Sequence, residues 1–396
     1  MKFDIFCEIQ RAAPWGADDE AALFRDTLIQ AAAADEAGFD VWWEVEHHSA
    51  PEFSYSSAPA VMLTAIAMRT RRIHVGHAGV LAPFRINNPY RVAEAAATLD
   101  LLSGGRLELG LAKSGGKEWE TFGVDPELAR AQVREGFSII SRFWTEDEVS
   151  WAGPDFSIPA RACVPKPLQK PHPRLWQTCG SPESFRMAGE MGVGCLGTTL
   201  LSPVSFMGQM IQEHEQGLAV CDPAGKFVNP EKGIFTFVHV AETRDQAIRN
   251  GAAWSALWYV HAAPIVFKVP RAVWYDAIRA GLHPNSPRST AALTGEDDTS
   301  LEIGPDELPV IALLKRMARN EVVSNAEAHE VLEELDSVVI GDVEHCRRKL
   351  EAYRAIGTNR MMCLMQFGSI PHAAVTRSIE LTGAHLIPHF AEALSA

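Results

Sequence analysis

The chain has 396 residues, of which 47% are hydrophobic and 22% charged, so it can form one large domain or two. Its net charge of −14 argues against a nucleic-acid partner and against an anionic membrane surface, because both require a basic face. No run of roughly 18 apolar residues predicts a transmembrane helix. The first eight residues indicate a strand interrupted by acids rather than a signal peptide.

Short apolar runs alternate with helical patterns along the whole chain. Such an alternation predicts a parallel sheet, and eight strands favour closure into a (β/α)₈ TIM barrel within a single domain, residues 1–396. The runs are nearly continuous in apolar residues, as expected of strands that are buried on both faces. The predicted strands are residues 3–8, 39–43, 72–81, 106–112, 174–179, 193–197, 234–240 and 360–367.

Two segments depart from this repeat. Residues 146–173 are rich in proline, tryptophan and small residues, and we expect a long crossing loop there. Residues 260–340 form an insertion between the seventh and eighth strands. They include 285–309, which are dense in Ser, Thr, Gly, Asp and Pro. Long loops inside compact domains are usually lids, binding loops or disordered stretches, so we predict a mobile cover over the barrel mouth.

The seven cysteines are scattered along the chain, odd in number and free of any CxxC pair. This pattern suits reduced thiols better than a disulfide framework or a zinc site. We therefore expect a cytoplasmic protein without a bound metal.

The second strand ends in Glu46-His47-His48, an acid followed by two imidazoles. In (β/α)₈ barrels, catalytic side chains lie at this C-terminal mouth. Neighbouring residues of an extended strand point to opposite faces, so at most one of the two histidines faces a pocket, and they cannot easily chelate one metal. Taken alone, the pair is equally compatible with two loop histidines that make structural hydrogen bonds.

The third and fourth strands end in small residues and a glycine-rich basic loop. Ala78-Gly79 would let a flat group approach the backbone, although tight barrel packing explains the same residues. The loop at residues 110–117 lacks the Walker spacing, and no GxGxxG follows the first strand. Its backbone N–H groups and Lys113 could still hold a phosphate.

A third candidate lies after the fifth strand. Ser181 fits a helix N-cap with Ser184 three residues later, and Pro182 sits at the first helical position. This is either a well-capped helix or a helix N-terminus that receives a phosphate on its free N–H groups. The local sequence does not separate these two interpretations.

Taken together, these residues resemble the bacterial luciferase-like family of flavin-dependent monooxygenases. The resemblance runs over nearly the whole chain, and it implies a (β/α)₈ barrel, in agreement with the strand count. It is carried by several motifs in the right order: Glu46–His48, Asn88–Glu94, Leu99–Arg106, Phe122–Asp125, Ile340–Asp342 and Phe367–Pro371.

The resemblance implies a role for individual residues. His47 would be the catalytic acid/base, with Glu46 orienting it or contacting the ring environment. Ala78-Gly79 would lie against the isoalloxazine ring, often through a non-proline cis peptide. The positions that would bind the flavin phosphate are Arg130, Gly180, Ser181 and Ser184, with Lys113 replacing an arginine of the family.

Other positions depart from the family pattern or concern the substrate. Ala112 stands where the luciferases carry a cysteine, which puts light emission with an aldehyde in doubt. His77 stands where a small polar residue is commoner, and it is a candidate for contact with the substrate. Aromatic residues indicate an apolar substrate pocket near the mouth, although core packing explains at least half of them: Trp42, Trp43, Trp119 and Trp176.

The resemblance implies a two-component monooxygenase. A separate flavin reductase would supply reduced FMN, and a flavin C4a-peroxide formed with O₂ would oxygenate a small, apolar organic substrate. The resemblance also implies a homodimer. One alternative is an F420-dependent hydride-transfer enzyme on the same barrel, and another is a non-catalytic flavin-binding partner subunit. A metal hydrolase using His47 and His48 would need further ligands.

Overall fold

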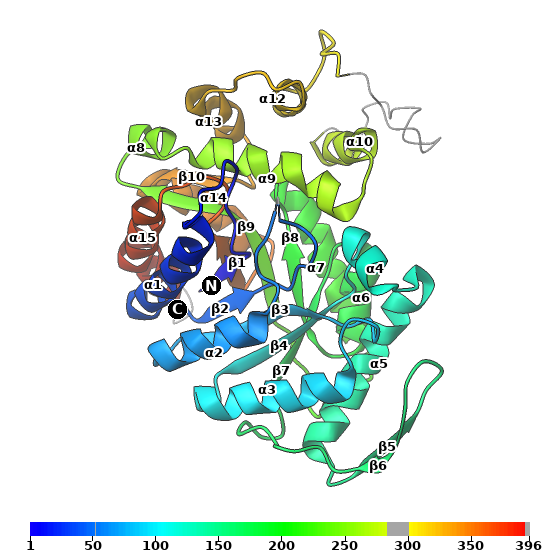
Figure 1. Cartoon of the computed structure of the whole chain (residues 1–396). Helices are drawn as coiled ribbons and strands as arrows, with labels where there is room; N and C mark the ends of the chain where they lie inside the picture. The colour runs from blue at the N-terminus through cyan, green and yellow to red at the C-terminus, as the bar shows by residue number, and fades with distance from the viewer. Residues whose placement is uncertain (52, 283–300, 393–396) are drawn as a thin grey trace.

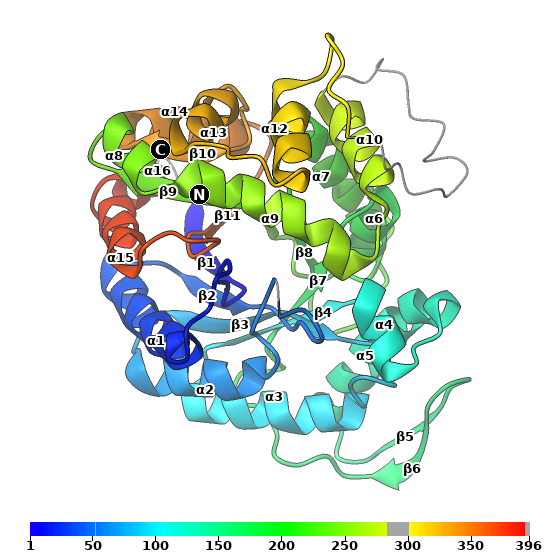
Figure 2. The ribbon, with the colours of Figure 1, turned by 45° about the horizontal axis from the view of Figure 1, so that its top comes forward.

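The computed structural model describes residues 1–51, 53–282 and 301–392. Within these residues, parallel strands close into a barrel in the order β1, β2, β3, β4, β7, β8, β9, β11 and back to β1 (Figures 1 and 2). The eight barrel strands are β1 (Lys2–Cys7), β2 (Val41–Glu44), β3 (His74–Leu81), β4 (Leu107–Ala112), β7 (Arg174–Thr178), β8 (Gly194–Thr198), β9 (Lys232–Ala241) and β11 (Arg360–Leu364). The predicted TIM barrel is confirmed, with every predicted strand in its place.

Helices surround the barrel, and local sequence signals fix several of their ends. Ser181 caps the helix that follows it, as predicted. Asn88 caps its helix in the same way, and Gly38 ends the first helix in a left-handed conformation. The helices that follow barrel strands are α1 (Asp19–Ala37), α2 (Pro59–Arg69), α3 (Pro89–Ser103), α4 (Gly116–Phe122), α5 (Pro126–Thr145), α6 (Pro182–Glu190), α7 (Val204–Leu218), α15 (His372–Leu381), η1 (Thr382–Leu386) and α16 (Ile387–Glu392). No helix in the described part of the chain is long and apolar enough to span a membrane.

The expectation of a long loop at residues 146–173 is wrong in part. The segment contains an antiparallel hairpin, β5 (Val149–Ala152) and β6 (Ser157–Arg161), which extends away from the barrel in Figure 1. Trp151 anchors the hairpin to α5, because its indole N–H donates to Glu135 at 2.6 Å and the Arg142 guanidinium lies 5.7 Å from its ring. Gly153 closes the turn by donating to the carbonyl of Phe156.

The segment between β9 and β11 is largely helical. It comprises α8 (Arg244–Arg249), α9 (Ala252–Phe267), α10 (Arg271–Leu282), α12 (Pro309–Ala318), α13 (Asn325–Glu333), β10 (Val339–Asp342) and α14 (Val343–Ala355). Strand β10 extends the sheet by pairing with the C-terminal half of β9. Helix α9 crosses the C-terminal end of the barrel (Figure 2). Most of the predicted mobile cover, residues 285–309, lies outside the described residues, so that expectation stays a prediction.

The opposite end of the barrel is tied together by charges. Arg360 at the start of β11 is completely buried and contacts Asp4 and Glu231 at 3.0 Å each, and also Asp40. Trp43 donates its indole N–H to Asp4 at 2.9 Å. This network closes the N-terminal end of the barrel and leaves the C-terminal end for a site.

Candidate functional site

His47 is held at the end of β2 by a carboxylate from α4. Its Nδ1 lies 2.9 Å from Glu118 Oε1, which also accepts the backbone N–H of His48 at 3.1 Å. The Ser114 hydroxyl donates to the other carboxylate oxygen at 2.6 Å. An ionised carboxylate can only accept, so in the bond between His47 and Glu118 the proton sits on Nδ1 of the imidazole. Nε2 is then an acceptor when His47 is neutral and a donor when it is protonated. Glu118, which the sequence analysis missed, therefore orients His47.

The surroundings of His47 favour its protonated form. Burial alone would lower the pKa of His47, but the hydrogen bond and charge of Glu118, with the charges of Glu8 and Glu46, raise it above its ordinary value. The rings of Phe53 and Phe267 stand edge-on to the imidazole, with centroids 5.8 and 6.1 Å away. The imidazole is thus a partly enclosed proton carrier.

Replacing Glu118 with glutamine should lower the pKa of His47, because the charge that favours imidazolium is removed. The ion pair of protonated His47 with Glu118 stabilises the folded protein fully below the ordinary histidine pKa of about 6.5. This stabilisation is lost as pH rises through the raised pKa of His47 in the folded state. NMR titration of ¹³C-labelled histidine measures the shift. Glu120→Gln is the control, since Glu120 lies on the same helix with 63% of its side chain exposed and pairs with Lys268. An unchanged His47 pKa in Glu118→Gln would contradict this assignment.

Glu8 is a second acid that the sequence analysis did not select. It is buried just after β1, where Tyr259 of α9 donates to it at 2.9 Å and Gln10 at 2.5 Å. Burial raises the pKa of Glu8 to about 7, although the His47 charge and both hydrogen bonds lower it. Its position after an apolar strand was the available signal, the same one that marks Glu46.

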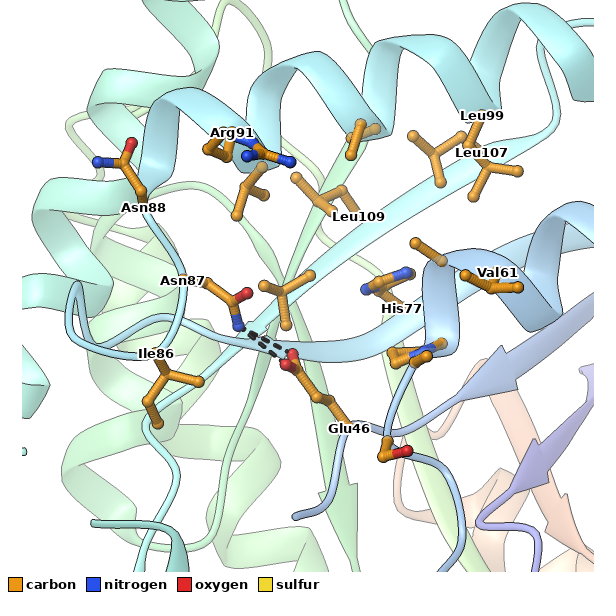
Figure 3. A pocket seen from close by; sticks show the side chains of 18 residues that line it. Glu46, Val61, His77, Ile86, Asn87, Asn88, Arg91, Leu99, Leu107 and Leu109 are labelled. Carbon is orange, nitrogen blue, oxygen red and sulfur yellow. Dashed lines mark hydrogen bonds between the residues drawn. The ribbon is translucent and has the colours of Figure 1, made fainter. Parts of the chain in front are cut away.

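Glu46 makes no hydrogen bond to His47, so the expectation that it orients this ring is corrected, and its contact with the ring environment of the flavin stays a prediction. One carboxylate oxygen lies 3.1 Å from His48 Nε2, and the other accepts the backbone N–H of Leu81 at 2.9 Å. The side-chain amide of Asn87 donates to both oxygens, as the dashed lines in Figure 3 show. Glu46 therefore ties the end of β3 to His48, and it reaches His47 only through its charge.

His77 does not face the barrel mouth, so its predicted contact with substrate there is corrected. Gly76 faces the interior, where an added Cβ would lie 2.3 Å from the Trp43 ring, and the next residue must point outward. His77 lines a cavity of about 450 Å³ between α2, α3 and the outer face of the barrel (Figure 3). Burial lowers the pKa of His77 to about 4, and its Nδ1 has no hydrogen-bond partner among residues 1–51, 53–282 and 301–392.

Ala78 and Gly79 interrupt the pairing of β3 with β4. The peptide bond between them is cis, and the register shifts between His77 and Val80. A Cβ on Gly79 would lie 2.8 Å from the Gly110 backbone, so tight packing against β4 accounts for the glycine. Ala78 is buried, and Ala112 lies opposite Leu81 at the end of β4. These small residues lie together at the C-terminal ends of neighbouring strands.

The predicted phosphate residues converge on one cavity. A space of about 250 Å³ at the ends of β4 and β7 is lined by Lys113, Arg130, Gly180, Ser181 and Ser184, among others. The two serines also form the capping box of α6: the Ser184 backbone N–H donates to Ser181 Oγ at 3.4 Å, and the Ser181 backbone N–H donates to Ser184 Oγ at 3.0 Å. The two serines therefore cap α6, as one of the two interpretations of the sequence held, and they also border the cavity.

The tryptophans divide into core and rim. Trp176 is fully buried, donates to Glu108 at 2.8 Å and meets Trp43 edge-on, so it belongs to the barrel core and not to a substrate pocket. Trp42 is buried as well. Trp119 is half-buried on α4, with the Lys113 ammonium 5.3 Å from its ring, beside the phosphate cavity. A substrate contact by Trp119 stays a prediction.

Comparisons with known proteins find relatives that use two kinds of cofactor. The oxygenase component of the flavin-dependent trigonelline monooxygenase from Acinetobacter baylyi is 27% identical over 252 residues, 62% of this chain and 67% of the relative. An F420-dependent glucose-6-phosphate dehydrogenase from Amycolatopsis mediterranei is 26% identical over 243 residues, 59% of this chain and 70% of the relative. Matches to these and other curated relatives cover 53% to 70% of the relatives' lengths.

A solved structure shares the fold over almost the whole length. The oxygenating constituent of 3,6-diketocamphane monooxygenase from Pseudomonas putida, in complex with FMN, superposes with a TM-score of 0.67 and 16% identity over 98% of both chains. The relatives include flavin-dependent monooxygenases and F420-dependent enzymes, which supports an oxidoreductase with a flavin-type cofactor. A family model described as luciferase-like monooxygenase matches residues 1–360, and the chain therefore belongs to that family.

Proposed function

We propose that the protein is the oxygenase of a two-component system, which takes reduced FMN from a separate reductase and uses O₂ to oxygenate a small organic substrate. One observation carries the proposal. The His47–Glu118 pair and a cavity lined by cationic and hydroxyl side chains lie on the same rim of the barrel. A relative named as an oxygenase component supports the separate reductase.

The residues around the cavity fit the phosphate of FMN. Arg130 offers a fork of N–H donors, Lys113 a point charge, and Ser181 and Ser184 two hydroxyls, next to a helix N-terminus that favours anions. In the capping bonds both serine oxygens accept from backbone N–H groups, so the Ser181 hydroxyl can still donate to a dianion. The Ser184 hydroxyl donates to the Ser181 carbonyl at 2.7 Å and would have to turn toward the dianion. The isoalloxazine ring would then extend toward Ala78, Gly79 and Ala112, where small side chains leave the backbone accessible.

The chain's own contribution to the reaction is positioning and proton control. The bound reduced flavin would supply the electrons that activate O₂. His47 would hold a proton at Nε2 for the reacting oxygen, because Glu118 fixes the ring through Nδ1 and favours imidazolium. Phe53 and Phe267 would limit the access of water to this proton.

Arg130→Ala should weaken the binding of reduced FMN by about 1.5–3 kcal/mol, the range for hydrogen bonds to charged groups, which is about 10-fold to 150-fold in Kd. Arg130 is exposed, so the lower end is expected because solvent screens the charge. Arg134→Ala on the same helix is the control, since Arg134 pairs with Glu190. Anaerobic fluorescence titration gives both constants. An unaltered Kd in Arg130→Ala would mean that the phosphate binds elsewhere.

The second candidate is hydride transfer with F420, which the dehydrogenase relative supports. Parallel titrations with reduced FMN and with F420 distinguish the two cofactors. Tighter binding of reduced FMN, together with substrate-dependent consumption of O₂, supports the monooxygenase. Tighter binding of F420 without O₂ consumption would replace it with the dehydrogenase. Binding of reduced FMN with no turnover of any substrate would indicate a non-catalytic subunit.

We also propose that two copies associate through α2 and α3. These helices expose the apolar side chains of Val61, Met68, Leu101 and Leu102, with exposed fractions of 72%, 59%, 43% and 48%, and Val61 also lines the cavity of Figure 3. Val61→Glu should convert a dimer to a monomer in analytical ultracentrifugation. Val220→Glu, at a residue 67% exposed after α7, is the control. A monomeric parent protein would contradict the proposal.

A further inference from the structure

A second cavity lies at the same end of the barrel, beneath α10. This α10 chamber has a volume of about 260 Å³ and is bordered by the ends of β7 and β8. Large apolar side chains from three helices form its walls: Phe206, Met207 and Met210 of α7, Val260 of α9, and Trp274 and Ile278 of α10. The volume lies just below the roughly 300–1,000 Å³ typical of pockets for drug-sized ligands, so the chamber suits a compact molecule.

Among the described residues, the lining of the α10 chamber contains no Asp, Glu, Lys, Arg or His side chain. An ion that entered it would lose its hydration without gaining a partner of opposite charge, so the chamber selects against charged ligands. The phosphate cavity has the opposite character, since Lys113 and Arg130 line it. Methionine side chains adapt to irregular ligand shapes, and two of them line the chamber.

Two polar groups of the lining are buried without a hydrogen-bond partner in the described part of the chain. They are the indole Nε1 of Trp274 and the hydroxyl Oγ1 of Thr198. An indole N–H can only donate, so a ligand that satisfies it must present an acceptor. A buried donor without a partner costs free energy, which a carbonyl or hydroxyl oxygen of a ligand would recover.

The α10 chamber adjoins both parts of the site described above. Gly180 lines the chamber and also the phosphate cavity on the other side of the same loop. Val260 follows Tyr259, whose hydroxyl donates to Glu8 at the end of β1. A ligand in the chamber would therefore lie between the phosphate cavity and the helix that covers the barrel mouth.

We propose that the α10 chamber binds the body of the substrate, and that this substrate is a compact, uncharged, largely apolar molecule with one oxygen that accepts a hydrogen bond from Trp274. Calling the ligand a substrate rests on the proposed function. Binding of such a molecule to the chamber does not, and it can be measured on protein that carries no flavin.

Calorimetric titration of the flavin-free protein with cyclooctanone, cyclooctane and cyclooctanecarboxylate tests the proposal. We expect the ketone to bind more tightly than the hydrocarbon and the carboxylate to bind least. Trp274→Phe keeps the ring and removes the donor, so it should weaken ketone binding about threefold to tenfold, the range for one neutral hydrogen bond, and leave hydrocarbon binding unchanged. The matched control is Trp15→Phe at an exposed tryptophan outside the chamber.

Ile278→Trp fills the α10 chamber and should abolish binding of both neutral probes, with folding checked by circular dichroism. The Kd of reduced FMN, measured on each variant, separates this proposal from the proposed function. If the parent protein does not bind reduced FMN, the proposed function is overturned, but the proposal that the α10 chamber binds a neutral ligand is not affected. No ketone binding by the parent protein, preferred binding of the carboxylate, or ketone binding unaffected by Trp274→Phe would overturn the chamber.

Discussion

His47→Ala is expected to lower product formation by about 10²-fold to 10⁴-fold, the usual contribution of a positioned acid or base. The alanine cannot hold the proton that we propose at Nε2 of His47. The Kd of reduced FMN should stay within a few-fold, because the phosphate residues lie at the ends of β4 and β7 and are untouched. Product formed per reduced FMN consumed, with the best-bound neutral ketone as substrate, measures the loss.

His48→Ala is the matched control for this change. It removes the adjacent imidazole, which contacts Glu46 instead of Glu118 and stands edge-on to Phe122. We expect a much smaller loss of turnover, through a weaker tie between β2 and β3. Equal losses in the two variants, or unchanged turnover in His47→Ala, would remove His47 from the reaction.

Arg360→Met is expected to give the largest loss of stability. Arg360 is completely buried between three carboxylates, and removing one partner of a buried ion pair costs about 3–5 kcal/mol because it leaves a buried charge uncompensated. Urea unfolding should show a lower midpoint. Arg347→Met, at an exposed pair with Glu344, should stay within about 0.5 kcal/mol.

The loss in Arg360→Met should grow with pH. Burial raises the pKa of Asp4 to about 6 even with Arg360 beside it, and removal of the arginine raises this pKa further. An acid whose pKa is higher in the folded state than in the unfolded state destabilises the fold as pH rises through this interval. Unfolding at pH 5 and pH 8 tests the sign, and Asp4→Asn in the same chain should recover part of the loss. A loss independent of pH would rule out the uncompensated charge as its cause.

The barrel could be predicted because its strands carry their own signals. Nearly continuous apolar runs mark the strands, and caps such as Asn88 and Ser181 act within four residues of themselves. The hairpin at residues 149–161 was missed because its two strands are short and largely exposed, which hides the apolar alternation. The helices of the β9–β11 segment were not predicted one by one. Helix α9, for example, is buried on nearly all sides, so it lacks the separate apolar and polar faces that mark a surface helix in a sequence.

The site could be predicted only in part, because its residues meet across long sequence separations. Glu118 lies 71 residues from His47, and the residues around Glu118 in the sequence give no signal that it contacts this histidine. The outward direction of His77 follows from Gly76 lying against the Trp43 ring, which is a packing fact of the barrel. The residues that the resemblance assigned to the flavin phosphate, Lys113, Arg130, Ser181 and Ser184, do line one cavity, and their binding of a phosphate stays a prediction.

A crystal structure of the protein soaked with FMN tests the central claim most directly. The account predicts electron density for the phosphate between the Arg130 guanidinium and the hydroxyls of Ser181 and Ser184, and for the ring against Ala78-Gly79 on the side of His47. Phosphate density outside the cavity at the ends of β4 and β7, or a flavin ring turned away from His47, would contradict the account.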